Sequence, residues 1–308
     1  MKRGQRRKTS STATPDVLKH LADSLDTGWN RYRKRLKQCQ EGFSEAAVHQ
    51  SRVETRRLLS TIELLGAFLP EAGIEKARVS LKAHLDTFDK LRDTQVQLIY
   101  VGHLTEKFPA AREFHEWLVR REDRFLRATR KAVKRIKTGR TGRRIRVFHK
   151  AVKHRRKQMT PEAAFKAVGT SVDRAFKRVA TLCGKVRGED TETIHRTRIA
   201  FKRFRYMAEA LSPLLPALTD EHRRAMRGYQ SLMGDIQDVE VLIATFGKFR
   251  RKENVTGRAV CKLEEELHKR RQWLIRVYLY AAGKLGQFWP PRPFAPQKQS
   301  EKPKPQKT

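Results

Sequence analysis

Two segments of the chain place one histidine and several basic side chains at helical spacing. Residues 48–58 read VHQSRVETRRL, and residues 194–204, which lie 146 positions further along, read IHRTRIAFKRF. With about 100° of rotation per residue, the basic residues three and seven positions after the histidine fall on its side of a helix, nearly opposite the large apolar residues. A guanidinium group can grip two phosphoryl oxygens, an amine supplies a point charge, and a histidine can be protonated beside an anion. The pattern predicts a phosphate-binding surface.

We name this pattern the histidine-arginine stripe. Its members are His49, Arg52 and Arg56 in the first segment and His195, Arg198 and Lys202 in the second, with Arg57 and Arg203 flanking it. For a single segment, the alternative is a solvated basic face. Recurrence in the same register favours binding, because solubility does not require a histidine at one position of both copies. Glu63 and Glu209 lie on the same side of each helix, where they either orient the arginines or form ordinary surface ion pairs.

Proline positions and apolar spacing predict that the stripe lies on helices. The segments between prolines carry apolar residues at intervals of three and four, and alternating strand patterns are nearly absent. Thr14-Pro15-Asp16 and Thr160-Pro161-Glu162, also 146 residues apart, each predict a capped helix start with proline at the first helical position. The expected helices span residues 15–40, 45–68, 72–108, 110–157 with a break allowed at 139–142, 161–186, 191–213, 217–249 and 255–287.

A second pair of matching segments extends the repeat. Residues 91–96 (LRDTQV) match residues 236–241 (IQDVEV) at a spacing of 145. This predicts an all-α protein made by duplication of a four-helix unit, with units at 14–158 and 159–289 packed through a shared face. A basic N-terminal tail (1–13) and a Pro- and Lys-rich tail (290–308) are expected to be disordered.

The composition points to an anionic partner in a reducing compartment. The chain has 69 Lys and Arg against 33 Asp and Glu, and its net charge of +36 would strain a compact fold by self-repulsion unless a polyanion or counterions neutralise it. Three distant cysteines indicate neither a disulfide framework nor a zinc site. The basic N-terminus has no apolar segment typical of a signal peptide, and no stretch approaches the roughly 20 apolar residues that cross a bilayer. We therefore expect a cytoplasmic protein without membrane insertion.

The paired motifs resemble the CHAD domain, the conserved histidine α-helical domain, over about residues 14–289. The resemblance rests on the His-x-x-Arg motifs that begin at His49 and His195 and on the Asp motifs at 92–93 and 238. It implies two four-helix bundles related by pseudo-symmetry around a basic central channel that binds inorganic polyphosphate. It also allows association with polyphosphate storage granules.

Carried over position by position, the resemblance assigns all members of the stripe to the channel. It also assigns the flanking Arg57 and Arg203 to the channel and adds Arg205 and Tyr206 at the end of the second motif, while Arg121 and Arg271 are candidates only because the fourth helix of each unit should face the same channel. Three differences between the copies bear on the site, since Leu59 stands for Arg205, Ser60 for Tyr206 and Asp89 for Gly234. Unequal contacts by the two halves are expected.

Other functions are weighed against polyphosphate binding. We expect no catalysis, no cofactor and no bound metal. The sequence has no cluster of residues with the spacing of metal ligands, and it lacks the E-x-E-x-K signature of the catalytic domain that many relatives carry. Non-specific nucleic-acid binding is the main alternative, through residues 140–157 and both tails, because the pI is near 10.8. An architectural, granule-coating role through the C-terminal tail is the third possibility.

Overall fold

The computed structural model describes residues 14–289, and both predicted tails lie outside the described residues. Within this range the secondary structure is helical apart from one isolated bridge between Arg187 and Asp190, and no helix there is long and apolar enough to cross a membrane. The all-α prediction is confirmed. The elements are α1 (Val17–Glu41), α2 (Glu45–Leu65), α3 (Glu71–Asp86), α4 (Asp89–Gly102), α5 (Pro109–Lys134), α6 (Gly139–Gln158), α7 (Pro161–Cys183), α8 (Thr191–Ala210), η1 (Ser212–Leu214), α9 (Asp220–Lys252), α10 (Arg258–Ala282) and η2 (Gly283–Phe288).

Side-chain caps explain where several helices begin. Thr160 accepts a hydrogen bond from the Ala163 amide, and Pro161 is the first residue of α7, as the sequence predicted. At the corresponding N-terminal site the prediction was wrong by two residues. Asp16, rather than Thr14, caps α1 by accepting from the Lys19 amide at 2.9 Å, and Pro15 lies before the helix.

The predicted helix 72–108 is divided in the structure. α3 ends at Asp86, α4 begins at Asp89, and α4 itself ends at Gly102. At the interruption, Phe88 is buried and its amide donates to the Leu85 carbonyl in a tight turn. Hydrophobic periodicity alone does not distinguish this buried position from an ordinary helix position.

The predicted helix 110–157 is also divided, at residues 135–138 instead of at the glycines. Gly139 is the first residue of α6, and Gly142 is inside the helix. A Cβ atom on Gly142 would lie 3.0 Å from the Trp29 ring. This glycine therefore permits close packing of α6 on α1 and does not break the helix.

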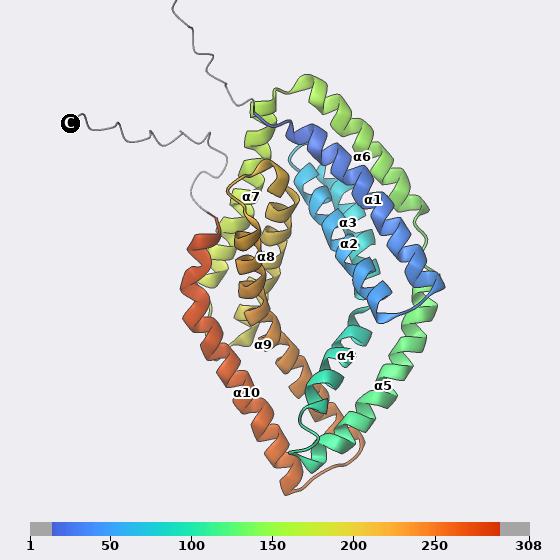
Figure 1. Ribbon diagram of the computed structural model, residues 1–308, viewed down its shortest axis with the longest axis vertical. Helices are drawn as coiled ribbons and strands as arrows, with labels where there is room; N and C mark the ends of the chain where they lie inside the picture. Colours follow the sequence, from blue (N-terminus) through green and yellow to red (C-terminus); the bar gives the residue numbers. More distant parts are fainter. Residues whose placement is uncertain (1–13, 290–308) are drawn as a thin grey trace, which may run out of the picture.

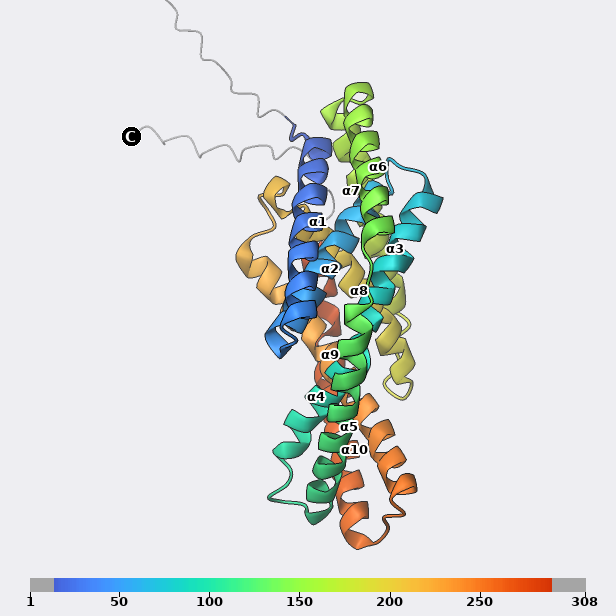
Figure 2. The ribbon, with the colours of Figure 1, turned by 90° about the vertical axis from the view of Figure 1, so that its right-hand side faces the viewer.

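The helices form an elongated molecule with two halves at one end and a shared bundle at the other (Figure 1). In the upper half of Figure 1, α1, α2, α3 and α6 pack together on one side, and α7, α8 and parts of α9 and α10 pack on the other. At the lower end α4 and α5 meet the remaining parts of α9 and α10. Figure 2 shows the narrow side, with α1 and α6 in front over the upper half and α5 continuing below α6.

The buried side chains form a large upper core and a small lower core. The large core takes residues from both upper sides, including Leu58 of α2 and Phe204 of α8. The small core joins α4 and α5 to α9 and α10, and its centre is Phe114, whose ring lies 5.1 Å from Phe246 and 5.2 Å from Phe249. Both cores thus contain residues from before and after residue 158, so neither predicted unit has a core of its own.

Candidate anion-binding site

α2 and α8 lie against each other and bring the two copies of the histidine-arginine stripe together. Each helix buries its apolar side, with Leu58 and Ile62 on α2 and Phe201 and Phe204 on α8 fully inside the large core. The polar sides keep the register that the sequence predicted. Burial of the apolar sides therefore fixes the rotation of both helices and with it the direction of the stripe.

Four basic residues of the stripe form one group, which we name the cation cluster: Arg52, Arg56, Arg198 and Lys202. All four are half-buried. Burial, followed by the charges of the three arginines, lowers the pKa of Lys202 from 10.5 to about 7. Burial and the charge of Arg52 likewise lower the pKa of Arg56, while Tyr206 partly offsets this effect. Because crowding disfavours the charged forms, an anion placed here would stabilise them.

Arg52 has partners within the protein. Its Nη1 donates to Asp89 Oδ1 at 2.9 Å and to the Leu85 carbonyl at 3.3 Å. Both acceptors lie at the interruption between α3 and α4, so the turn that divides the predicted helix also anchors one cation of the cluster. The sequence comparison identified Asp89 as a departure from Gly234 but did not identify it as the partner of Arg52.

Arg198 has no such partner at the matching position. The corresponding residue on α9 is Gly234, and a Cβ atom there would lie 3.8 Å from Arg198 Nε. This Nε is buried and has no hydrogen-bond partner. The two copies therefore differ in a definite way, since the Asp89 carboxylate accepts a hydrogen bond from Arg52 in one, whereas the matching position 234 offers Arg198 no side chain in the other.

Two further carboxylates border the cation cluster. Burial raises the pKa of Asp93 on α4, and the neighbouring charges of Asp89 and Asp238 raise it further. Burial also raises the pKa of Asp238 on α9, while Arg198 acts in the opposite direction. These residues belong to the Asp motifs of the sequence. Their positions limit the positive charge of the cluster on the side of α4 and α9.

The flanking arginines are exposed and paired. Arg57 Nη1 donates to Glu54 at 2.7 Å, within α2. Arg203 Nε donates to Glu63 at 3.1 Å and so links α8 to α2. Of the two roles that the sequence left open for Glu63, the structure shows an ion pair, and its partner comes from the other copy of the stripe.

Arg205 lies in different surroundings from the cluster, whereas Tyr206 interacts with Arg56 of the cluster. Arg205 is 5% exposed, and its guanidinium donates to Glu209 at 2.6 Å and to Gln230 at 2.8 Å. It also stacks on the Tyr206 ring at 4.2 Å. Arg205 thus forms a buried ion pair with Glu209 within α8, and its hydrogen bond to Gln230 connects α8 to α9.

Arg121 lies on α5 and Arg271 on α10, and each has an acidic residue nearby. Burial and the charge of Arg124 lower the pKa of Arg121, and Asp93 partly offsets this effect. Arg271 Nη1 lies 3.5 Å from Glu240. The Nε atoms of both arginines are buried without a hydrogen-bond partner, so each retains a donor for a ligand.

The two histidines of the stripe are placed unequally. His49 is exposed near the start of α2. His195 is half-buried, and its Nδ1 is buried without a hydrogen-bond partner. An available ring nitrogen at this position can serve an anionic ligand directly when it carries a proton.

A cleft of about 490 Å³ adjoins the site through Tyr206. It contains both basic and acidic side chains, namely His20, Asp23, Arg31, Glu54, Arg57, Glu209, Arg223 and Arg227. The sequence did not predict the contribution of Arg31, Arg223 and Arg227, because they come from helices without the stripe motif. The spacing of residues within one helix does not predict that arginines from different helices line the same cleft.

Together these observations define an all-α protein in which two adjacent helices carry a cation cluster suited to an anionic ligand. The chain belongs to the CHAD domain family, whose model matches residues 23–247. This family is linked in general to polyphosphate binding. No curated protein matches the chain.

Solved structures share the fold at low sequence identity. The CHAD domain from the plant Ricinus communis matches with a TM-score of 0.60 and 17% identity, over 92% of this chain and 96% of the plant chain. PptA from Streptomyces chartreusis matches with a TM-score of 0.59 and 18% identity, over 88% of this chain and 99% of the other. At these identities the similarity establishes the fold and does not assign any residue a role.

Proposed function

We propose that this protein binds inorganic polyphosphate at the cation cluster. The observation that carries the proposal is the grouping of Lys202 with three arginines from two helices, where burial and then the arginine charges lower the pKa of Lys202 to about 7. A chain of phosphates has a negative charge at every unit and can meet several of these cations at once. The unpaired Arg198 Nε and His195 Nδ1 provide further donors.

We infer that the protein binds this polymer without cleaving it. The cluster consists of hydrogen-bond donors, and its bordering carboxylates act on its cations, with Asp89 bonded to Arg52. The predicted central channel would run along α2 and α8, with Arg121 and Arg271 extending it toward the lower end. Association with polyphosphate granules and a cytoplasmic location belong to the same proposal, and the basic composition supports the attraction to an anionic granule.

Calorimetric titration with polyphosphates of defined length tests the proposal. The variant Arg52→Gln/Arg198→Gln removes one cluster cation from each helix and should weaken binding by about 100-fold or more, because one charged hydrogen bond contributes about 1.5–3 kcal/mol. The matched control is Arg57→Gln/Arg203→Gln, which removes the same charge from the same two helices at exposed positions. We expect less than about a tenfold loss there, because exposed charges act mainly through screened long-range attraction.

Equal losses in the two variants would contradict the proposal, since affinity would then depend on net charge and not on the cluster. Thermal unfolding of both variants serves as the folding control. Arg52 is the residue whose replacement leaves Asp89 unpaired, so a single Arg198→Gln variant separates a loss of binding from a loss of that ion pair.

A further inference from the structure

The outer face of α6 carries a straight row of basic side chains. All of them are exposed, and they recur every three or four positions, which places them on one side of the helix. We name them the outer basic row: Arg140, Arg143, Arg146, Lys150, Lys153 and Lys157. The opposite side of α6 packs Ile145, Phe148 and Val152 into the large core. The row is therefore held on a rigid element over about 26 Å.

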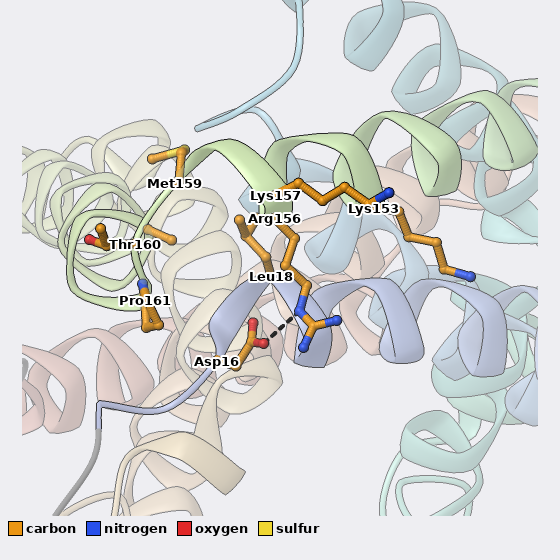
Figure 3. Close-up of a pocket in the computed structure, with 9 residues that line it drawn as sticks. Asp16, Leu18, Lys153, Arg156, Lys157, Met159, Thr160 and Pro161 are labelled. Atoms are coloured by element: carbon orange, nitrogen blue, oxygen red, sulfur yellow. Dashed lines mark hydrogen bonds and ion pairs between the residues drawn. The ribbon is translucent and has the colours of Figure 1, made fainter.

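These six cations have no acidic partner within the part of the chain that the structure describes. α6 contains no Asp or Glu. The carboxylates that neighbouring elements supply go to the flanks of the helix, where Arg156 pairs with Asp16 at 2.6 Å and His149 with Asp26 at 3.0 Å. Figure 3 shows the Arg156 pair, with the amino groups of Lys153 and Lys157 extending away from it.

Like charges three and four residues apart destabilise a helix. In α6 each member of the row has such a neighbour, and the sequence offers no carboxylate to separate them. The protein places carboxylates on the flanks of α6 and leaves the row without them. A polyanion that binds along the row would remove the repulsion.

The row differs from the cation cluster in shape and access. The cluster is half-buried between α2 and α8, whereas α6 forms the outer edge of the molecule (Figures 1 and 2). A wide ligand can lie along this edge without entering the protein. The cations are spaced by about 4.5–6 Å along the helix axis, which is comparable with one or two phosphates of a nucleic-acid strand at about 3.4 Å each.

We propose that the outer basic row binds the phosphate backbone of duplex nucleic acid. Lysine and arginine side chains on such a row contact phosphates, which fix position but carry no sequence information. Binding is therefore independent of base sequence and depends steeply on salt. This proposal does not rest on polyphosphate binding at the cation cluster, because the two sites share no residue.

The test compares the full-length protein with two variants of equal charge. Lys150→Gln/Lys153→Gln/Lys157→Gln removes half of the row while keeping good helix formers. The control is Lys248→Gln/Lys252→Gln/Lys262→Gln, which removes three exposed lysines from α9 and α10. Affinity for two 20-base-pair duplexes of unrelated sequence is measured by fluorescence anisotropy from 50 to 200 mM salt.

Each phosphate contact contributes about −0.9 to the slope of log affinity against log salt. The row variant lacks three such contacts, so the magnitude of its slope should be smaller by about 2.7. The factor by which duplex affinity falls between 50 and 200 mM salt should then be about 40-fold smaller in the variant than in the wild type. The control should keep the wild-type slope, and both duplexes should behave alike. Arg52→Gln/Arg198→Gln should also bind duplex as the wild type does.

Equal effects of the row variant and its control would overturn the proposal, because only the net charge would then matter. A row variant that binds duplex normally but loses affinity for long polyphosphate would overturn it as well, since the row would then serve that polymer. Loss of duplex binding in the Arg52/Arg198 variant alone would place the nucleic acid at the cation cluster and contradict the inference. Circular dichroism confirms that α6 keeps its helix in the row variant.

Discussion

Replacing Gly234 with aspartate should pair Arg198 and weaken binding at the cation cluster. Gly234 lies on α9 at the position that Asp89 occupies in the first copy, where Asp89 accepts from Arg52 at 2.9 Å. A Cβ atom at 234 would lie 3.8 Å from Arg198 Nε, which is an ordinary van der Waals contact. The aspartate side chain therefore fits beside the guanidinium and reproduces in the second copy the ion pair of the first.

The expected magnitude follows from competition for one cation. A ligand phosphate must displace the new carboxylate and tolerate its charge nearby, which we take to cost about as much as one charged hydrogen bond, about 1.5–3 kcal/mol. This corresponds to a loss of roughly 10- to 150-fold in polyphosphate affinity. The free energy of unfolding should rise by less than about 1 kcal/mol, because aspartate is a better helix former than glycine and gains an ion pair.

The assay is calorimetric titration with a short polyphosphate, combined with urea unfolding. Gly234→Ala is the matched control, since it makes the same Cβ contact and the same change in helix preference without a charge. The reciprocal variant Asp89→Gly frees Arg52 and should bind more tightly than the wild type. If Gly234→Asp and Gly234→Ala bind equally well, Arg198 does not contact the ligand and the reasoning is refuted.

Two further predictions concern single residues of α8. Because the pKa of Lys202 is about 7, polyphosphate affinity should fall as pH rises from about 6 to 8, and calorimetry in buffers of different ionisation enthalpy should show proton uptake on binding. The variant Lys202→Arg should lose this part of the pH dependence. An unchanged pH profile in the variant would show that Lys202 is not the group that titrates. Folding lowers this pKa from 10.5, so the unfolded chain binds the extra proton between pH 7 and 10.5, and the residue makes the free energy of unfolding increase with pH there. In the variant Arg205→Lys, the lysine cannot reach both Glu209 and Gln230, so the free energy of unfolding should fall by about 1.5–3 kcal/mol in urea titrations. A loss of polyphosphate affinity as large as that of the Arg52/Arg198 variant would contradict this structural role and show that Arg205 contacts the ligand.

The direction of the apolar faces followed from the sequence, but the interruptions, and with them the number of helices, did not. The period of apolar residues is the same on both sides of Phe88, so the sequence favoured one helix where the structure has a turn at this buried residue. Gly142 illustrates the opposite error. A glycine that would break an isolated helix is retained inside α6 because Trp29 of α1 occupies the space of its missing side chain. Both outcomes depend on a neighbouring element.

The same reasoning explains which part of the site could be predicted. Projection around one helix placed Arg198 and Lys202 on a common side, and the structure brings them to Arg52 and Arg56. The family resemblance also placed Arg205 in the channel, but α9 crosses α8 at that position and buries the guanidinium against Gln230. A single helix does not reveal where its neighbour lies. Partners such as Asp89, which is 37 residues from Arg52, therefore require the structure.

The distribution of carboxylates separates structural cations from those available to ligands. With 69 basic and 33 acidic residues, at least 36 cations must remain without a carboxylate of their own in any fold. The fold assigns carboxylates to cations that join helices, such as Arg205 on α8 and Arg203 between α8 and α2. Beside the second copy of the stripe, Gly234 stands where the first copy has an aspartate, and α6 itself contains no Asp or Glu. Since unpaired cations must exist, their concentration at these two places, one half-buried and one on an exposed edge, favours two different anionic ligands over one diffuse surface.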